Sequence, residues 1–258
     1  YIAGNTLGGI AGRLIPTGLL DFTGWRGALL GSAAVSAIFA ILFVILLPKQ
    51  ENFRPKKLHF KAEIRAMINH WRNLELGLLF LFAVLGMGAF VSMYNFITFR
   101  LIHHFGLPVT LTGLVFLMYL AGTWSSARVG TIINKYGHSK TFVVSAVLYA
   151  LGIVMTLGPL PVLLAGMFIF TAGFFAAHST ASGWVGQAAA TNRAEASSMY
   201  LLCYYAGSSA VGAASGLVFE ATSWTGFIAF ISCFTVAVIL IGAWLLKSTS
   251  RVKEPVAV

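Results

Sequence analysis

The chain has 258 residues, of which 58% are apolar and 9% are charged, and it carries a formal net charge of +10. A soluble domain has about 25% charged residues, so this composition excludes an ordinary water-soluble globule and indicates a protein that lies mostly in a bilayer. Nucleic-acid binding would need a broad solvated basic face, which so few charged residues cannot build. Cys203 and Cys233 both lie in apolar runs and are interpreted as small buried residues rather than a disulfide.

The apolar residues are gathered into long runs, and a spanning helix needs about 20 of them. The runs that qualify, in chain order, are 2–20, 27–48, 76–98, 109–130, 141–158, 161–186, 197–219 and 223–246. Short breaks that hold Gly, Pro or ionisable residues separate them. The runs are too long, and alternate too little, for a membrane barrel. The sequence therefore predicts an all-α polytopic helix bundle with about eight transmembrane helices.

Residues 49–74 differ from the rest because they are strongly basic. Their cationic residues are Lys49, Arg54, Lys56, Lys57, Lys61, Arg65 and Arg72. Their apolar residues recur at helical spacing: Phe60, Ile64, Met67, Ile68 and Trp71. This pattern is typical of an amphipathic helix on an anionic cytoplasmic leaflet, and a solvated linker helix is the alternative. The stretch divides the chain into 1–48 with two spans, the linker 49–74, and 75–258 with six spans.

The positive charge follows the predicted topology. With 49–74 in the cytoplasm, alternation of the spans places the loops near 128–140, 187–196 and 247–258 on the same side. Of the 17 Lys and Arg residues, all lie on that side except Arg13, Arg26 and Arg100. Cytoplasmic loops of membrane proteins carry such an excess. The sequence thus predicts a cytoplasmic C-terminus, and lipids rather than nucleic acid as surroundings.

Three local patterns accompany this arrangement of two spans, a basic linker and six spans. Residues 4–12 read Gly-Asn-Thr-Leu-Gly-Gly-Ile-Ala-Gly, Trp25-Arg26 precedes the second span, and residues 130–140 read Gly-Thr-Ile-Ile-Asn-Lys-Tyr-Gly-His-Ser-Lys. The first is similar to the helix-five motif of drug:proton antiporters, with Asn5 in place of Pro. The last resembles the G-x-x-x-D-R-x-G-R-R loop of the major facilitator superfamily, with Asn134 and Lys135 in place of Asp and Arg.

The chain as a whole resembles a major facilitator superfamily transporter of the bacterial multidrug-efflux branch, and covers helices five to twelve of the family's twelve. That resemblance implies a monomer in the bacterial inner membrane. It implies proton-coupled efflux of a small organic solute by alternating access, without cofactor, metal or enzymatic activity. The residues for which it implies a role in gating or coupling are Arg13, Gly4, Gly8, Gly9, Gly12, Gly130, Asn134, Lys135 and Gly137.

Small residues at four-residue spacing let helices approach closely. Gly4, Gly8 and Gly12 form such a row on the first span, and Ser208, Gly212 and Gly216 form another on the seventh. Plain helix packing is one interpretation, and sliding of these helices during transport is the other. A charge such as Arg13 within a span costs roughly 2.5–3.5 kcal/mol, so we expect it to face protein or water.

Polar and aromatic residues inside the spans mark the expected substrate pathway. Flat or cationic solutes suit aromatic rings through stacking and cation–π attraction, and core packing is the alternative role. The residues chosen for substrate contact are Asn95, Tyr119, Trp124, His178 and Tyr204.

Histidine is the side chain that ordinarily titrates near neutral pH, so His178 is a candidate proton relay, and a structural hydrogen bond is its alternative role. No Asp or Glu lies in the middle of a predicted span, so a proton-carrying carboxylate is expected in helices preceding Tyr1. Two other functions stay open. One is a non-transporting scaffold or receptor of the same fold. The other is an intramembrane hydrolase that pairs His178 with Ser182, although it lacks a G-x-S-x-G pattern, and no H-E-x-x-H metal motif is present.

Overall fold

The computed structural model describes residues 2–48 and 59–252, and within these ranges the regular elements are all helices. This confirms the all-α membrane fold class. Six helices are long and apolar enough to cross a membrane: Phe22–Leu46, Leu74–His103, His138–Met155, Leu160–Ala188, Arg193–Ala221 and Trp224–Ser248. Six of the eight predicted spans therefore meet these limits of length and composition within the described ranges.

The other two predicted spans, 2–20 and 109–130, are helical, but they do not meet the limits of length and composition for different reasons. In the first, only Leu7–Leu20 forms an apolar helix, and it is shorter than a span. The second, predicted over 109–130, is divided into α4 (Val109–Thr112), a 3-10 segment η2 (Gly113–Met118) and α5 (Tyr119–Tyr136). The 3-10 geometry interrupts the regular helix, and Arg128 and Lys135 make α5 more polar than its neighbours.

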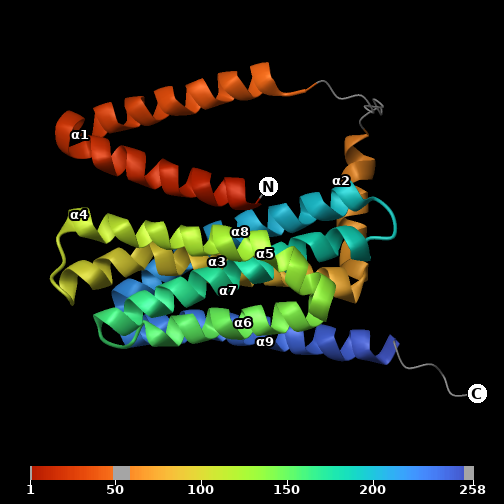
Figure 1. The fold of residues 1–258 in the computed structure, drawn as a ribbon. Coiled ribbons are helices and arrows are strands. Elements are labelled where there is room, and N and C mark those ends of the chain that lie inside the picture. Colours follow the sequence, from red (N-terminus) through yellow and green to blue (C-terminus); the bar gives the residue numbers. More distant parts are fainter. Residues whose placement is uncertain (1, 49–58, 253–258) are drawn as a thin grey trace, which may run out of the picture.

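The first helix, α1 (Ile2–Leu46), bends sharply at one glycine. Gly24 has φ 67° and ψ 177°, a backbone conformation that costs glycine little. The bend divides α1 into a first arm (residues 2–23) and a second arm (residues 25–46), which fold back toward each other (Figure 1). The first arm lies along the bundle and contacts η2 and α5. The predicted break at 21–26 is thus a bend at a single residue.

The linker region contains a short helix, α2 (Phe60–Asn69), followed by the 3-10 turn η1 (His70–Arg72). Figure 1 shows α2 running across one end of the bundle, at a steep angle to the long helices. Nε2 of His70 lies 3.1 Å from the carbonyl oxygen of Asn192, and the Trp71 ring meets Phe80 edge-on at 5.3 Å. Most of the apolar side of α2 stays exposed, with Phe60 70% accessible. Lys49, Arg54, Lys56 and Lys57 lie outside the described residues.

The long helices α3 (Leu74–His103), α6 (His138–Met155), α7 (Leu160–Ala188), α8 (Arg193–Ala221) and α9 (Trp224–Val252) form the bundle. Extensive contacts join α3 to α8 and α6 to α7. The backbones approach closely at glycines, since a Cβ on Gly207 would lie 2.5 Å from Cα of Val84 and a Cβ on Gly173 would lie 2.5 Å from the backbone nitrogen of Tyr149. Cys203 is buried and Cys233 is exposed, and both are free thiols, so the burial predicted for Cys233 is wrong.

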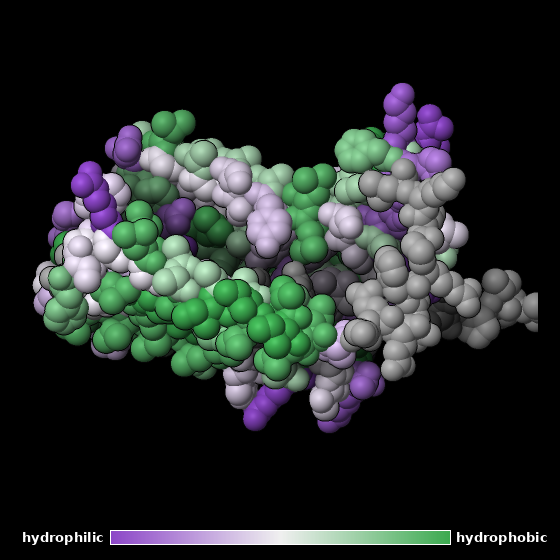
Figure 2. Space-filling model, turned by 90° about the horizontal axis from the view of Figure 1, so that it is seen from above, coloured by the Kyte–Doolittle hydropathy of each residue, from purple (hydrophilic) through white to green (hydrophobic). Residues whose placement is uncertain are grey.

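The ends of the bundle differ in charge. The junctions α5–α6 and α7–α8 lie at the same end as α2, and α9 runs out there too (Figure 1). We call this the basic end, because Lys135, Lys140 and Arg193 lie at those junctions and Lys247 near the end of α9. Figure 2 shows hydrophobic side chains over much of one face, with hydrophilic side chains chiefly at its margins.

Candidate functional site

A cluster of aromatic rings fills the middle of the bundle. Phe90 of α3 stacks on Phe174 of α7 with ring centroids 4.2 Å apart, and it also meets Tyr119 edge-on at 5.6 Å. The Tyr94 hydroxyl lies 2.6 Å from Oγ1 of Thr171, and the Tyr149 hydroxyl donates to the carbonyl oxygen of Gly86 at 2.7 Å. Buried phenols need such partners, so these bonds fix how α3, α6 and α7 sit together.

From this cluster a row of rings leads from α5 across α7 to α8. Tyr119 lies 5.9 Å from Phe175, Phe175 lies 5.3 Å from Phe174, and Phe174 lies parallel to His178 at 5.9 Å. His178 in turn lies 4.7 Å from Tyr204. Three of the residues predicted for substrate contact, Tyr119, His178 and Tyr204, are therefore joined through Phe174 and Phe175. We call these three residues and the two phenylalanines the aromatic row.

His178 has a hydrogen-bonding partner on the neighbouring helix. Its Nδ1 lies 2.8 Å from the hydroxyl oxygen of Tyr200, and both side chains are buried. Tyr200 and Tyr204 lie one turn apart on α8, so both can face α7. Tyr200 was not among the residues predicted for substrate contact. Its four-residue spacing from Tyr204 could have indicated that both rings lie on the same face of the helix. Nδ1 of His178 thus faces a phenol and not Ser182, the nucleophile considered for a hydrolase.

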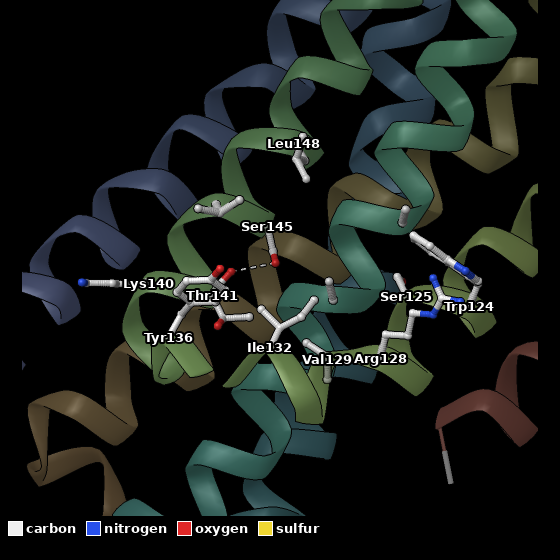
Figure 3. A pocket seen from close by; sticks show the side chains of 13 residues that line it. Trp124, Ser125, Arg128, Val129, Ile132, Tyr136, Lys140, Thr141, Ser145 and Leu148 are labelled. Carbon is white, nitrogen blue, oxygen red and sulfur yellow. Dashed lines mark hydrogen bonds between the residues drawn. The ribbon is translucent and has the colours of Figure 1, made fainter. Parts of the chain in front are cut away.

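The other two predicted contact residues lie elsewhere. Asn95 is exposed on α3. Trp124 lines a groove of about 500 Å³ between α5 and α6 (Figure 3), which Ala172 and Ala176 of α7 also line. There the guanidinium carbon of Arg128 lies 4.7 Å from the Trp124 ring. The surface of the groove is largely apolar, and the figure shows Arg128 and Trp124 together on its α5 side.

Arg13 faces protein, as expected for a charge within a helix. Its guanidinium carbon lies 4.4 Å from the centre of the Phe116 ring, at the contact between the first arm of α1 and η2. On the same arm, a Cβ on Gly9 would lie 3.6 Å from the Tyr119 ring. Arg13 and Gly9 thus place the first arm directly beside Tyr119, at one end of the aromatic row.

The glycine row on the first arm meets open space in the described structure. A Cβ on Gly4, Gly8 or Gly12 would have no neighbour within 4 Å. These residues line a cleft of about 570 Å³ whose opposite wall includes Val35 and Phe39 of the second arm. The second predicted row is in ordinary contact with α3, since Cβ atoms on Gly212 and Gly216 would lie 3.6 Å from Val91 and 3.7 Å from Phe96. Within the described residues the two rows do not meet each other.

The motif at 130–140 forms the sharp turn from α5 to α6. Gly137 has φ 81° and ψ 165°, and its carbonyl oxygen accepts a bond of 2.8 Å from the Thr141 hydroxyl. Asn134 and Lys135 are exposed, with the Lys135 nitrogen 5.1 Å from the Tyr136 ring. A Cβ on Gly130 would meet nothing within 4 Å.

The basic end also holds a contact that sequence reasoning missed. The Trp184 indole of α7 donates a hydrogen bond of 2.7 Å to Oε1 of Glu75 at the start of α3. His138 at the start of α6 lies 5.6 Å from the same indole. Three helices are therefore tied together here by a carboxylate and two rings. The partners are 109 residues apart, so no local pattern reports their contact.

Comparison with known proteins agrees with this architecture. The family model of the Major Facilitator Superfamily matches residues 1–130 and 78–257. The inner membrane transport protein YnfM of Escherichia coli K12 is 40% identical over 244 residues, which are 94% of this chain and 58% of that protein. The uncharacterised MFS-type transporter YybF of Bacillus subtilis is 33% identical over 250 residues, 96% of this chain and 62% of that protein.

A solved structure shares the fold. The nucleoside transporter NupG superposes with a TM-score of 0.72 at 19% identity, over 92% of this chain and 65% of that one. The bundle of long apolar helices is that of a polytopic membrane protein, and the relatives that it matches are named as transporters. The chain belongs to the Major Facilitator Superfamily, a family of transporters and not of enzymes. It spans about three-fifths of the length of the curated relatives it matches.

Proposed function

We propose that the protein moves a small organic solute across the bacterial inner membrane by alternating access. The observation that carries this proposal is the aromatic row, which runs from α5 through α7 to α8 and contains a buried imidazole. Stacked rings accept flat or cationic solutes without demanding one hydrogen-bond pattern. The family membership and the transporters among the relatives agree with this reading.

The finer assignments rest on the same features. We assign substrate contact to Tyr119, His178 and Tyr204, with Asn95 and Trp124 as outlying contacts. The chain corresponds to helices five to twelve of twelve, with 49–74 as the linker between the halves. The glycine motif at 4–12 favours the multidrug-efflux branch, and export as the direction. The basic end favours the cytoplasm for α2 and for the C-terminus.

We propose that movement of the solute is coupled to movement of protons. His178 lies inside the row and shares a hydrogen bond with Tyr200, which gives a proton a defined position between α7 and α8. Arg13 and the glycines of the first arm lie beside the same row and are assigned to gating. Gly130, Asn134, Lys135 and Gly137 are assigned to gating at the basic end. The working unit is a monomer whose partners are its solute, protons and lipids.

The direct test uses the full-length protein in an efflux-deficient bacterial host, with a panel of aromatic and cationic drugs. Tyr204→Ala should abolish resistance and efflux of any drug that the wild type exports. Tyr205→Ala is the matched control, because Tyr205 is the adjacent ring, is 56% exposed and lies outside the row. Equal loss in both variants at equal expression would show that the row has no special role. Full-length protein that moves no member of the panel and gives no proton flux would favour the scaffold alternative.

A further inference from the structure

The end of the bundle opposite the basic end holds a pocket that the proposed transport pathway does not use. It has a volume of about 300 Å³ and lies where α3, α8 and α9 meet. Its walls include the rings of Phe99, Phe219 and Trp224, and the ionisable side chains that line it are Arg100, His103 and His104. A concave apolar site with a few convergent polar groups is the usual form of a small-ligand pocket.

The chain turn after α3 shapes one side of this site. Gly106 has φ 67°, its N–H donates to the carbonyl oxygen of Ile102, and the N–H of Leu107 donates to that of Leu101. This pair of bonds is the helix-ending arrangement that a glycine in the left-handed region permits. The turn brings the Phe105 ring to 5.5 Å from the guanidinium carbon of Arg100.

Trp224 shapes the other side. Its indole N–H donates to the carbonyl oxygen of Thr156 at 3.2 Å, which fixes the ring against the end of α6. The ring centre then lies 5.8 Å from the guanidinium carbon of Arg100. Arg100 is thus held near two aromatic rings, neither of which can accept its N–H groups as an oxyanion would.

One nitrogen of the Arg100 guanidinium lacks a polar partner in the part of the chain that the structure describes. Within residues 2–48 and 59–252, the buried Nε of Arg100 has no hydrogen-bond partner. A buried donor left without a partner costs free energy, and Arg is the residue best suited to bind a carboxylate or phosphate through a planar fork. The excess of basic residues on one side of a membrane protein does not explain Arg100, because the basic residues of this chain gather at the opposite end of the bundle.

We propose that this pocket binds an oxyanion carried on an apolar body, with the Arg100 fork on the carboxylate or phosphate and the rings of Phe99, Phe219 and Trp224 around the apolar part. His103 and His104 line the same pocket and add polar groups at its rim. Two kinds of molecule carry an oxyanion on an apolar body and could reach this end of the bundle: a soluble organic acid, and a phospholipid of the adjacent leaflet through its headgroup. The site lies apart from the aromatic row and does not depend on the transported solute.

The test uses the purified full-length protein, with benzoate and phenyl phosphate as probes and benzyl alcohol as the neutral comparison. Binding is followed by tryptophan fluorescence, which Trp224 should report, and by the thermal unfolding midpoint. Both anions should bind saturably to the wild type and about tenfold more weakly to Arg100→Gln, a loss of about 1.4 kcal/mol. Arg26→Gln is the matched control, since Arg26 lies at the same end against the exposed ring of Trp25.

A second arm separates the two sources. Protein in nanodiscs of phosphatidylcholine should bind the soluble anions, whereas phosphatidylglycerol should compete with them if a lipid headgroup is the natural occupant. Competition should vanish in Arg100→Gln and persist in Arg26→Gln. Arg100→Lys keeps the charge without the fork and should bind weakly while eluting as folded protein. Anion binding that is equal in wild type and both Arg100 variants, or lost equally in Arg26→Gln, would overturn the proposal.

Discussion

Nδ1 of His178 lies 2.8 Å from the hydroxyl oxygen of Tyr200, and this bond joins α7 to α8 beside the aromatic row. Both residues are buried, so the bond is shielded from water and its partners cannot easily exchange it for another. Any rearrangement between α7 and α8 during transport has to keep this bond or break it.

Removing the Tyr200 hydroxyl should therefore be costly. Tyr200→Phe leaves Nδ1 of His178 without its partner, and we expect a loss of about 1–3 kcal/mol in the free energy of unfolding. The measurement is denaturant unfolding in mixed micelles. Tyr205→Phe removes an equivalent hydroxyl from an exposed ring and should change little. Similar values for the two variants would mean that the bond contributes nothing.

Gly207 should tolerate no side chain. A Cβ there would lie 2.5 Å from Cα of Val84 and nearer still to its carbonyl oxygen, so Gly207→Val must push α8 away from α3. We expect this variant to fail to give a monodisperse peak in size-exclusion chromatography. Gly212 lies further along α8. Gly212→Ala would place its Cβ 3.6 Å from Val91, which is an ordinary van der Waals contact. Normal elution of both variants would contradict the observed packing.

Gly8 tests the gating role of the first arm. Gly8→Leu would project into the cleft between the two arms of α1, where the described structure has room for it, so we expect normal expression. If the arms close on each other during the transport cycle, the rate of transport should fall several-fold. Gly18→Leu on the same arm also meets open space but does not line that cleft. Unchanged transport by Gly8→Leu would remove the gating role.

Gly137 should be required by its backbone conformation alone. With φ 81° and ψ 165°, it occupies a region that side chains rarely reach, so Gly137→Val should cost about 1–3 kcal/mol. Gly130→Ala lies in the interior of α5, has free space around its Cβ, and should be neutral or stabilising by up to about 1 kcal/mol. Thermal unfolding in detergent compares them. A stable Gly137→Val would show that the turn adopts another geometry.

The apolar runs predicted the helices well, because burial in a bilayer demands continuous hydrophobic sequence. They could not report that 109–130 is interrupted, since the 3-10 segment at Gly113–Met118 is as apolar as its surroundings. Helical geometry does explain the separation of two predicted contact residues. Tyr119 and Trp124 are five positions apart on α5, a rotation of about 140° about the helix axis, so they cannot face the same space.

Contacts between distant parts of the chain were beyond reach for a different reason. Tyr94 with Thr171, and Glu75 with Trp184, are paired by the packing of whole helices rather than by local spacing. The glycine rows show the same limit. Four-residue spacing marked Gly8 and Gly212, while much closer helix approaches occur at Gly173 and Gly207, which the spacing rule does not distinguish.

The contact between Arg13 and Phe116 has a mechanical consequence for α1. If the first arm left the bundle sideways, the guanidinium would exchange an aromatic face for hydrocarbon, at a cost of roughly 2.5–3.5 kcal/mol. Displacement along the bundle axis keeps the charge over the aromatic surface of η2 and α5 and carries no such cost. We therefore expect the first arm to resist detachment from the bundle more than sliding along it, with the bend at Gly24 separating its movement from that of the second arm.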